Sequence, residues 1–383
     1  MALKTINDEY LIAIGEAIRK KNGTEETYKP SEMAEAIRSI EGGGIGEIIL
    51  TGDCIYALAA PAWDSILSNI ETENITNCKY MFYTSPVETA PIEINCKIDE
   101  YIDCSYMFYK NVNLKEIPKF NNCKPNKTYQ MFANCYNLRE IPEEKVSGID
   151  MTAHTTNVAE GADRSSMFLN CYSLRSIPSS LLAKQDMAYN SYNNSYYYQG
   201  FRKCYNLEEL VDIPVVGSTI YSVDSNMFYY TFSNCSRLKE LTFATDGAKY
   251  IKWCNQTIDL SDYVGYFNGY TKAYDVLGGY NTGIDTTKRG FDSTTFNAYK
   301  DDPDFFTDVV SYSRYNHDSA VRTINSLPDT SIYVSEKGKP NIIKFRGQSG
   351  SGYSIDGRNL AISNLTDAEI AVATAKGWTV SFV

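Results

Sequence analysis

The sequence predicts a mixed α/β repeat protein: an N-terminal helical hairpin, then an irregular β-rich solenoid with a C-terminal cap. Three observations predict this class, namely an internal repeat in the middle of the chain, helical periodicity at its start, and a helix-capping and strand pattern at its end. The chain has 383 residues, which fits several units or one extended array. Its 31 Tyr, against 16 Phe and 3 Trp, indicate much half-exposed surface or a binding face.

Residues 1–41 have the apolar periodicity of two consecutive helices, separated near Asn22 and Gly23. So short a segment buries little surface, and we expect this helical anchor to dock on another protein or to self-associate. The glycine-rich residues 42–46 then predict a flexible linker. The predicted inward-facing residues of the anchor are Leu11, Ile14, Ile18, Met33, Ile37 and Ile40.

The main feature is a repeat of the form Met-Phe-x2-Cys-x2-Leu-x2-Ile-Pro within residues 47–243, with successive Phe residues 24 to 36 positions apart. A single unit cannot bury its apolar side chains, so the units are expected to stack into one continuous core. The repeated positions are Phe108, Phe132, Phe168, Phe201 and Phe232; Cys135, Cys171, Cys204 and Cys235; and Leu114, Leu138, Leu174, Leu207 and Leu238.

The cysteine position of the repeat is expected to lie at a tight turn. Asn111 occupies it in one unit, which indicates that these cysteines are structural and argues against pairwise disulfides. The chain begins without the basic and apolar stretches of a signal peptide, so synthesis in a cytoplasm and reduced thiols are expected. Pro118, Pro142 and Pro178 are expected to end each strand, because proline cannot donate to a sheet.

The remaining segments are expected to complete the array. Residues 244–315 hold many aromatic residues among Gly, Asp and Thr, and are interpreted as diverged Tyr-rich repeats with loops. Residues 316–383 are interpreted as a cap, with a short helix from Asp318 or Ser319. Thr366 and Glu369 form a predicted capping box, and the alternating residues after Gly377 predict a final strand.

Composition and motifs exclude several function classes. The net charge of −11 argues against nucleic acid and anionic lipid as partners, and no apolar run is long enough to span a membrane. The sequence has no Gly-x-Ser-x-Gly motif, and its histidines, His154 and His317, are interpreted as surface residues. The acidic residues 301–304 lack a calcium-loop spacing. We therefore expect no enzyme, metal or cofactor, although a glycosidase carboxylate pair stays an open alternative.

Tyrosines outside the repeat pattern are the candidate ligand contacts. Aromatic faces stack on sugars and their hydroxyls bond sugar hydroxyls, whereas packing between subunits or under loops is the alternative explanation. Tyr136, Tyr172 and Tyr205 follow the repeat cysteines and are interpreted as a structural ladder. The candidate glycan contacts are Tyr189, Tyr192, Tyr196, Tyr197, Tyr198, Tyr229 and Tyr230.

The Phe-x2-Cys-x2-Leu-x2-Ile units of residues 80–243 resemble BspA-type leucine-rich repeats of bacterial surface proteins and of the phages that infect those bacteria. Irregular insertions at 146–166 and 183–199 depart from that pattern. The segments 15–19 and 30–37 resemble the leader of phage tail-fibre and tail-associated proteins. The stretches 316–319 and 365–380 resemble the ends of phage-encoded repeat proteins.

These resemblances imply a phage virion protein, made in the host cytoplasm, that acts as a tail-associated receptor-binding protein with a leucine-rich-repeat solenoid. They imply tail or baseplate proteins as partners of the helical anchor, and a host-surface glycan or protein as partner of the solenoid. A homotrimer follows only by analogy with tail fibres. The alternatives are a structural or decoration component of the virion, and a bacterial surface adhesin, against which the missing signal peptide argues.

Overall fold

The computed structural model describes residues 48–59, 67–151, 165–182, 197–214, 228–233, 235, 238–244, 251–261, 317–345 and 365–382. The predicted helical anchor and the glycine linker lie outside the described residues, and so do most of the predicted diverged repeats.

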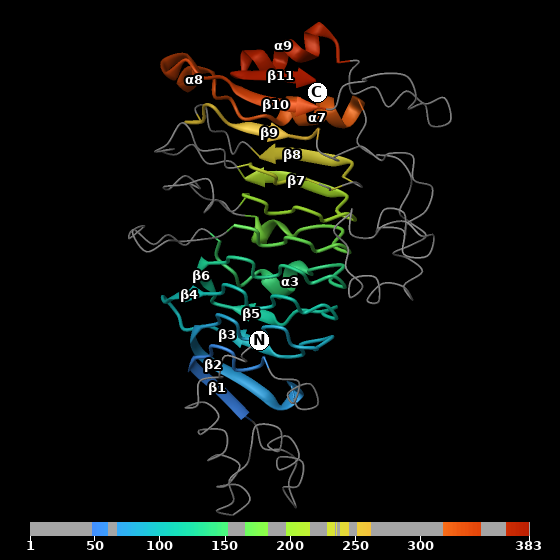
Figure 1. Ribbon diagram of the computed structural model, residues 1–383. Coiled ribbons are helices and arrows are strands. Elements are labelled where there is room, and N and C mark those ends of the chain that lie inside the picture. The colour runs from blue at the N-terminus through green and yellow to red at the C-terminus, as the bar shows by residue number, and fades with distance from the viewer. Residues whose placement is uncertain are drawn as a thin grey trace, which may run out of the picture.

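The described chain forms an elongated stack of short parallel strand pairs, which runs from β1 at one end to β11 at the other (Figure 1). Parallel pairing requires the chain to return to the same side between two partner strands. Each unit therefore makes one circuit before it pairs with the next. The pairs are β1 (Ile48–Asp53) with β2 (Ile70–Asn77), β3 (Glu93–Asn95) with β5 (Lys119–Asn121), β4 (Tyr101–Asp103) with β6 (Lys124–Lys127), and β7 (Glu209–Pro214) with β8 (Glu240–Ala244).

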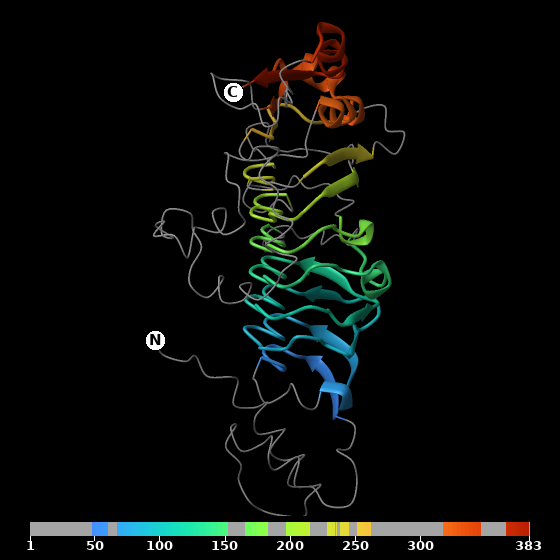
Figure 2. The ribbon, with the colours of Figure 1, turned by 90° about the vertical axis from the view of Figure 1, so that its right-hand side faces the viewer.

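Tight turns lie along one side of the stack and strands along the opposite side (Figure 2). We call the first side the turn edge; it comprises the turns at 54–58, 78–85, 104–111, 128–135, 165–171, 197–204 and 228–233. Backbone hydrogen bonds join neighbouring turns in register. The amide of Phe82 donates to the carbonyl of Met107 (2.9 Å), and the amide of Phe108 donates to that of Met131 (2.8 Å).

The phenylalanines of the repeat form a continuous stack inside the turn edge. Ring centroids are 5.0 Å apart for Phe82 and Phe108, 5.3 Å for Phe108 and Phe132, and 5.5 Å for Phe132 and Phe168. The stack continues through Phe201 at 5.9 Å. Every Phe, Cys and Leu of the predicted repeat positions is fully buried, and each such Phe or Leu contributes roughly 1.5–3 kcal/mol of hydrophobic stabilisation.

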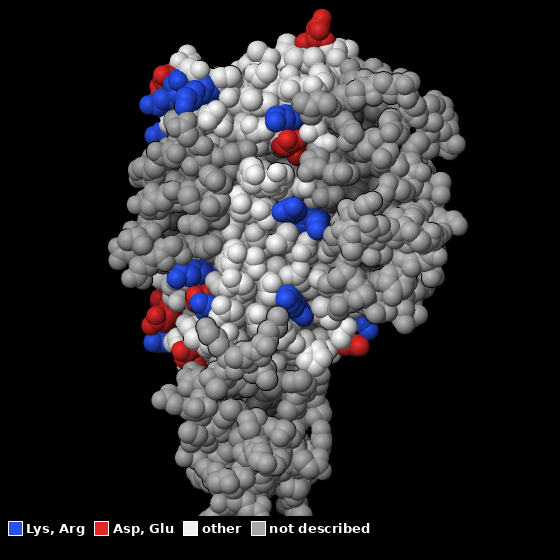
Figure 3. Space-filling view, in the orientation of Figure 1, with Lys and Arg blue, Asp and Glu red and all other residues white. Residues whose placement is uncertain are grey.

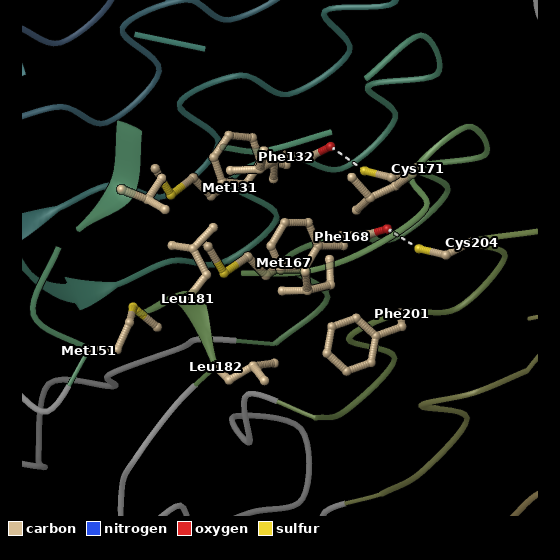
Figure 4. Packing of buried hydrophobic residues seen from close by; sticks show 14 of the residues in the cluster. Met131, Phe132, Met151, Met167, Phe168, Cys171, Leu181, Leu182, Phe201 and Cys204 are labelled. Carbon is tan, nitrogen blue, oxygen red and sulfur yellow. Dashed lines mark hydrogen bonds between the residues drawn. The ribbon is translucent and has the colours of Figure 1, made fainter. Parts of the chain in front are cut away.

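The repeat cysteines connect each unit to the one before it. The thiol of Cys171 donates to the carbonyl of Phe132 (3.0 Å), and the thiol of Cys204 to that of Phe168 (3.1 Å), as Figure 4 shows. Cys135 and Cys235 make the same bond, to Phe108 and Phe201, at 3.1 Å each. All ten cysteines of the chain are buried free thiols.

The predicted role of the prolines as strand terminators is wrong for Pro118, where β5 begins at the next residue, whereas an isolated bridge at Ser176 does end just before Pro178. Pro118 immediately precedes β5, Pro142 is the N-cap of helix α3 (Glu143–Val146), and Pro178 precedes the 3-10 helix η4 (Ser179–Leu181). Proline suits such a position because its fixed φ and missing N–H cost little where the first amide of an element has no partner. A further 3-10 helix, η2 (Leu67–Asn69), lies directly before β2.

The C-terminal end contains helices α7 (His317–Ser326), α8 (Ser331–Lys337) and α9 (Asp367–Ala375), with strands β10 (Asn341–Phe345) and β11 (Trp378–Phe382). The predicted capping box of Thr366 and Glu369 is confirmed, as are a helix at 317–326 and the final strand. Sequence analysis missed α8 and β10.

The sheet of this end also takes a strand from outside the predicted cap. β9 (Thr257–Asp259), within the predicted diverged repeats, pairs in parallel with β10. The side chain of Thr323 on α7 donates to the carbonyl of Leu241 on β8 (2.6 Å), so the C-terminal helices are bonded directly to the stack.

Two stacked units have a polar side chain in place of the bonded thiol, Ser85 and Asn111. The buried Nδ2 and Oδ1 of Asn111 have no hydrogen-bond partner. We predict that Asn111→Cys raises the free energy of unfolding by about 1–3 kcal/mol, the cost of leaving such a group unsatisfied. Urea unfolding measures the change. Asn111→Ala is the control for loss of the polar group alone. A lower free energy of unfolding for Asn111→Cys would contradict the prediction.

Candidate functional site

The predicted glycan contacts divide into three groups. Tyr189, Tyr192 and Tyr196 lie outside the described residues. Tyr197 is fully buried, and its ring stacks on Phe228 at 5.3 Å. Burial raises the pKa of its hydroxyl, so Tyr197 belongs to the core rather than to an exposed site.

The structure brings Tyr198, Tyr229 and Tyr230 together. Tyr198 and Tyr229 stack with centroids 5.5 Å apart, and Tyr230 packs edge-on against Tyr229 at 4.2 Å. The guanidinium of Arg202 lies over the Tyr230 ring, 5.2 Å from its centroid. Tyr229 and Tyr230 are 39% and 43% exposed, so a ligand can reach them.

A larger set of tyrosines, which sequence analysis missed, lies on the N-terminal half of the turn edge. Tyr56, Tyr80 and Tyr106 form one row, with centroids 4.6 and 4.9 Å apart. Tyr83 and Tyr109 form a second row at 5.5 Å. We call these five residues and Tyr129, which packs edge-on against Tyr106 at 5.1 Å, the tyrosine platform.

The two rows of the platform pack against each other through edge-on ring contacts. Tyr83 packs edge-on against Tyr80 at 5.3 Å, and Tyr109 packs edge-on against Tyr106 at 5.5 Å. The signal for this arrangement was present in the sequence as Tyr-Met-Phe-Tyr, which occurs at 80–83 and again at 106–109. Sequence analysis missed these tyrosines because it considered only the buried positions of the repeat, which they flank.

The platform turns share one backbone feature with the later turns of the edge, where Gln130 and Ser166 also have positive φ (52° and 57°). Tyr56, Tyr80 and Tyr106 have φ of 59°, 58° and 58°, in the left-handed region that disfavours side chains with a β carbon. Such a residue costs of order 1–3 kcal/mol and persists only where its surroundings hold it. Here the hydrogen bonds between neighbouring turns supply that support, since the Tyr80 amide donates to the Ser105 carbonyl (3.1 Å).

The platform presents edges and hydroxyls rather than free ring faces. Tyr80 is covered on both faces, by Tyr56 and Tyr106, so a ligand can approach only its rim. Burial, the largest cause, and the neighbouring tyrosines raise the pKa of all three hydroxyls in this row. These hydroxyls therefore stay protonated at neutral pH and can both donate and accept hydrogen bonds.

Lysines beside the platform tyrosines differ from lysines near the strands in whether they have a carboxylate partner. The ammonium of Lys79 lies 5.2 Å from the Tyr80 centroid and that of Lys110 lies 5.4 Å from the Tyr109 centroid. Within the described part of the chain, neither lysine has a carboxylate within ion-pair distance. Lysines near the strands are paired instead, as in Lys115–Glu88 (2.8 Å) and Lys119–Glu93 (3.1 Å). In the view of Figure 3, charges form isolated groups on a mostly uncharged described surface.

Two features that the sequence analysis weighed and set aside as chemical sites cannot be placed. His154 and the acidic residues 301–304 lie outside the described residues. Among the residues that the structure describes, no group of three or more His, Cys, Asp or Glu side chains is arranged to hold a metal ion.

His317 joins two helices. Its Nε2 lies 3.2 Å from Glu369 on α9, and its Nδ1 lies 3.4 Å from Asp318 on α7. Partial burial lowers the pKa of His317, but hydrogen bonds to Glu369 and Asp318 outweigh this effect and raise it overall. When protonated, His317 forms an ion pair with Glu369 and so joins α7 to α9.

Comparisons with protein-family models, curated proteins and solved structures give no match to this chain. In the described ranges, no helix has the length and apolar character needed to cross a membrane.

The raised pKa of His317 predicts a pH-dependent contribution to stability. A raised folded-state pKa stabilises fully below the unfolded value of about 6.5, and the effect is lost as pH rises through the folded value. We expect His317→Gln to lower the melting temperature at mildly acidic pH and to leave it unchanged at alkaline pH. Thermal unfolding across this range measures the difference, with Lys337→Gln on α8 as control. An equal loss at both pH values would contradict the account.

Proposed function

We propose that this protein is a phage virion protein that binds a host-surface glycan through the turn edge of a leucine-rich-repeat-like solenoid. The observation that carries the proposal is the tyrosine platform. Six tyrosines from four consecutive turns form an extended, half-buried surface, and at least one row of them keeps protonated hydroxyls.

The platform suits an extended ligand with regularly repeated polar groups. Its rungs recur at 4.6 to 5.5 Å along the stack, because each turn is hydrogen-bonded to the next. A polysaccharide offers hydroxyls at every sugar, so several weak hydrogen bonds can form side by side. Each such bond contributes about 0.5–1.5 kcal/mol, and the sum rather than one strong contact would give the affinity.

The cluster of Tyr198, Tyr229 and Tyr230 extends the same edge toward the C-terminal end. It differs from the platform because Tyr230 carries the Arg202 guanidinium at 5.2 Å. We propose that this cluster is a second contact for the same polymer. Two contacts on one rigid stack would strengthen binding by raising the effective concentration of the second site.

The remaining elements of the proposal concern assembly. The helical anchor at 1–41 would dock onto tail or baseplate proteins, and the linker at 42–46 would let the stack reorient toward the cell. Trimer formation remains an analogy with tail fibres. A structural or decoration role in the virion is the second candidate, favoured by the covered ring faces of Tyr80, which suit packing against another subunit.

Hydroxyl deletion tests the glycan proposal while it keeps the rings, although Tyr129→Phe also removes the bond that Gln130 Nε2 donates to the Tyr129 hydroxyl (3.0 Å). We predict that Tyr80→Phe, Tyr106→Phe and Tyr129→Phe together weaken binding of the full chain to purified host cell-wall polysaccharide about tenfold or more, from about 0.5–1.5 kcal/mol per lost bond. Isothermal titration measures the affinity.

Tyr101→Phe is the matched control, because Tyr101 is 46% exposed but lies on β4, away from the turn edge. Unchanged affinity of the triple variant would remove the platform from the binding site. If the full chain binds neither whole host cells nor wall polysaccharide while it assembles onto particles, the structural role becomes the better account.

A further inference from the structure

Four buried thiols lie together behind the tyrosine platform. Cys78 and Cys104 each stand two residues before a platform tyrosine, Tyr80 and Tyr106. Cys96 and Cys123 come from the corners that follow β3 and β5. We call Cys78, Cys96, Cys104 and Cys123 the thiol quartet; three are fully buried and Cys96 is 4% exposed.

Two sulfurs of the quartet are in direct contact. Sγ of Cys104 and Sγ of Cys123 are 3.8 Å apart, within thiol hydrogen-bond distance. The neighbouring thiols of Cys78 and Cys96 affect each other's pKa, and Cys123 lowers that of Cys96. The repeat cysteines differ, because each donates its S–H to a backbone carbonyl, as Cys171 does to Phe132.

Clustered cysteines usually bind a metal ion or form disulfides, and the quartet does neither in this structure. It is not arranged as a metal site, and no disulfide joins its members. An apolar residue could fill these core positions as well. Ile75 pairs with Cys96, and Ile149 with Cys123, in isolated β-bridges between neighbouring units. The distinctive property of this group is therefore the direct sulfur contact between Cys104 and Cys123.

We propose that the thiol quartet is an oxidative modification site, at which a peroxide converts Cys104 and Cys123 into an internal disulfide. This inference does not depend on the proposed function. To form the bond, the sulfurs must close from 3.8 Å to about 2.05 Å, and rotation about the side-chain bonds can supply part of that movement.

The reaction balances with peroxide as the oxidant. One thiol loses its proton and attacks the O–O bond, which forms an S–O bond and releases hydroxide that becomes water. The second thiolate attacks the resulting sulfenic sulfur, so an S–S bond forms, the S–O bond breaks, and a second water leaves. Two thiols are oxidised and one peroxide is reduced to two waters.

Burial sets the rate of this step. For Cys104, the thiol contact with Cys123 lowers the pKa, but contact with Cys78 and burial outweigh it and raise the pKa well above its ordinary value. Contacts with Cys104 and Cys96, together with burial, raise the pKa of Cys123. Since the thiolate is the nucleophile, oxidation should be slow at neutral pH and faster at alkaline pH.

The disulfide would have a structural consequence for the platform. It would link β4 and its following turn to the corner before β6, across two neighbouring units that both contribute platform tyrosines. A covalent link of this kind restricts the unfolded chain and raises resistance to heat. The platform would thereby become more rigid once the protein meets an oxidising environment.

The test uses the full chain, hydrogen peroxide as oxidant, and mass spectrometry after alkylation and digestion without reduction. We expect a cross-linked peptide pair containing Cys104 and Cys123, formed faster at about pH 9 than at about pH 7. We also expect a melting temperature several degrees higher, which dithiothreitol reverses. Cys123→Ala should abolish the cross-link, whereas Cys171→Ala, which removes an equally buried thiol outside the quartet, should retain it.

Competing results would overturn the proposal. Cys96 is the outermost thiol, and the S–H groups of Cys123 and Cys78 lower its pKa to about 5, so it is the strongest competitor. A dominant link to Cys96, or full alkylation of all ten cysteines after peroxide treatment, would disprove the Cys104–Cys123 site. If Cys123→Ala fails to fold, the wild-type peptide map alone decides between these outcomes.

Discussion

The in-register stacking of the turns is the constraint on which the rest of the structure depends. Each turn places one phenylalanine ring on the ring of the next unit, at 5.3 Å for Phe108 and Phe132 and 5.5 Å for Phe132 and Phe168. The cysteine three positions after each phenylalanine donates its S–H to the phenylalanine carbonyl of the previous unit. This bond fixes the same register through the backbone. Ring stacking contributes about 0.5–1.5 kcal/mol per pair beyond burial, and its value lies in specifying alignment.

This alignment explains why the tyrosines outside the core also form rows. Tyr80 and Tyr106 hold the same place in successive turns, so stacking of the buried phenylalanines brings these half-buried rings into contact as well. The left-handed backbone at these residues is held by hydrogen bonds between turns. The proposed binding surface is thus a consequence of the core register rather than a separate pocket built onto it.

Sequence analysis predicted the buried positions well, because a side chain that recurs at one place in each unit must meet its equivalent. Phe132, Cys171 and Leu174 are all fully buried, as that reasoning required. It misjudged Pro118 and Tyr197, since a local rule cannot tell a strand's end from its start, or an exposed aromatic from a buried one. The platform was missed because Tyr83 and Tyr109 become neighbours only after the units stack.

The most direct test of this account is a double-mutant cycle on the phenylalanine stack, measured by urea unfolding. Phe132→Leu and Phe168→Leu, made singly and together, should show a coupling energy of about 0.5–1.5 kcal/mol. The pair Phe82 and Phe168, whose rings are separated by two others, should be additive within about 0.5 kcal/mol. Additive effects for the adjacent pair, or equal coupling in both pairs, would contradict the claim that ring stacking sets the register.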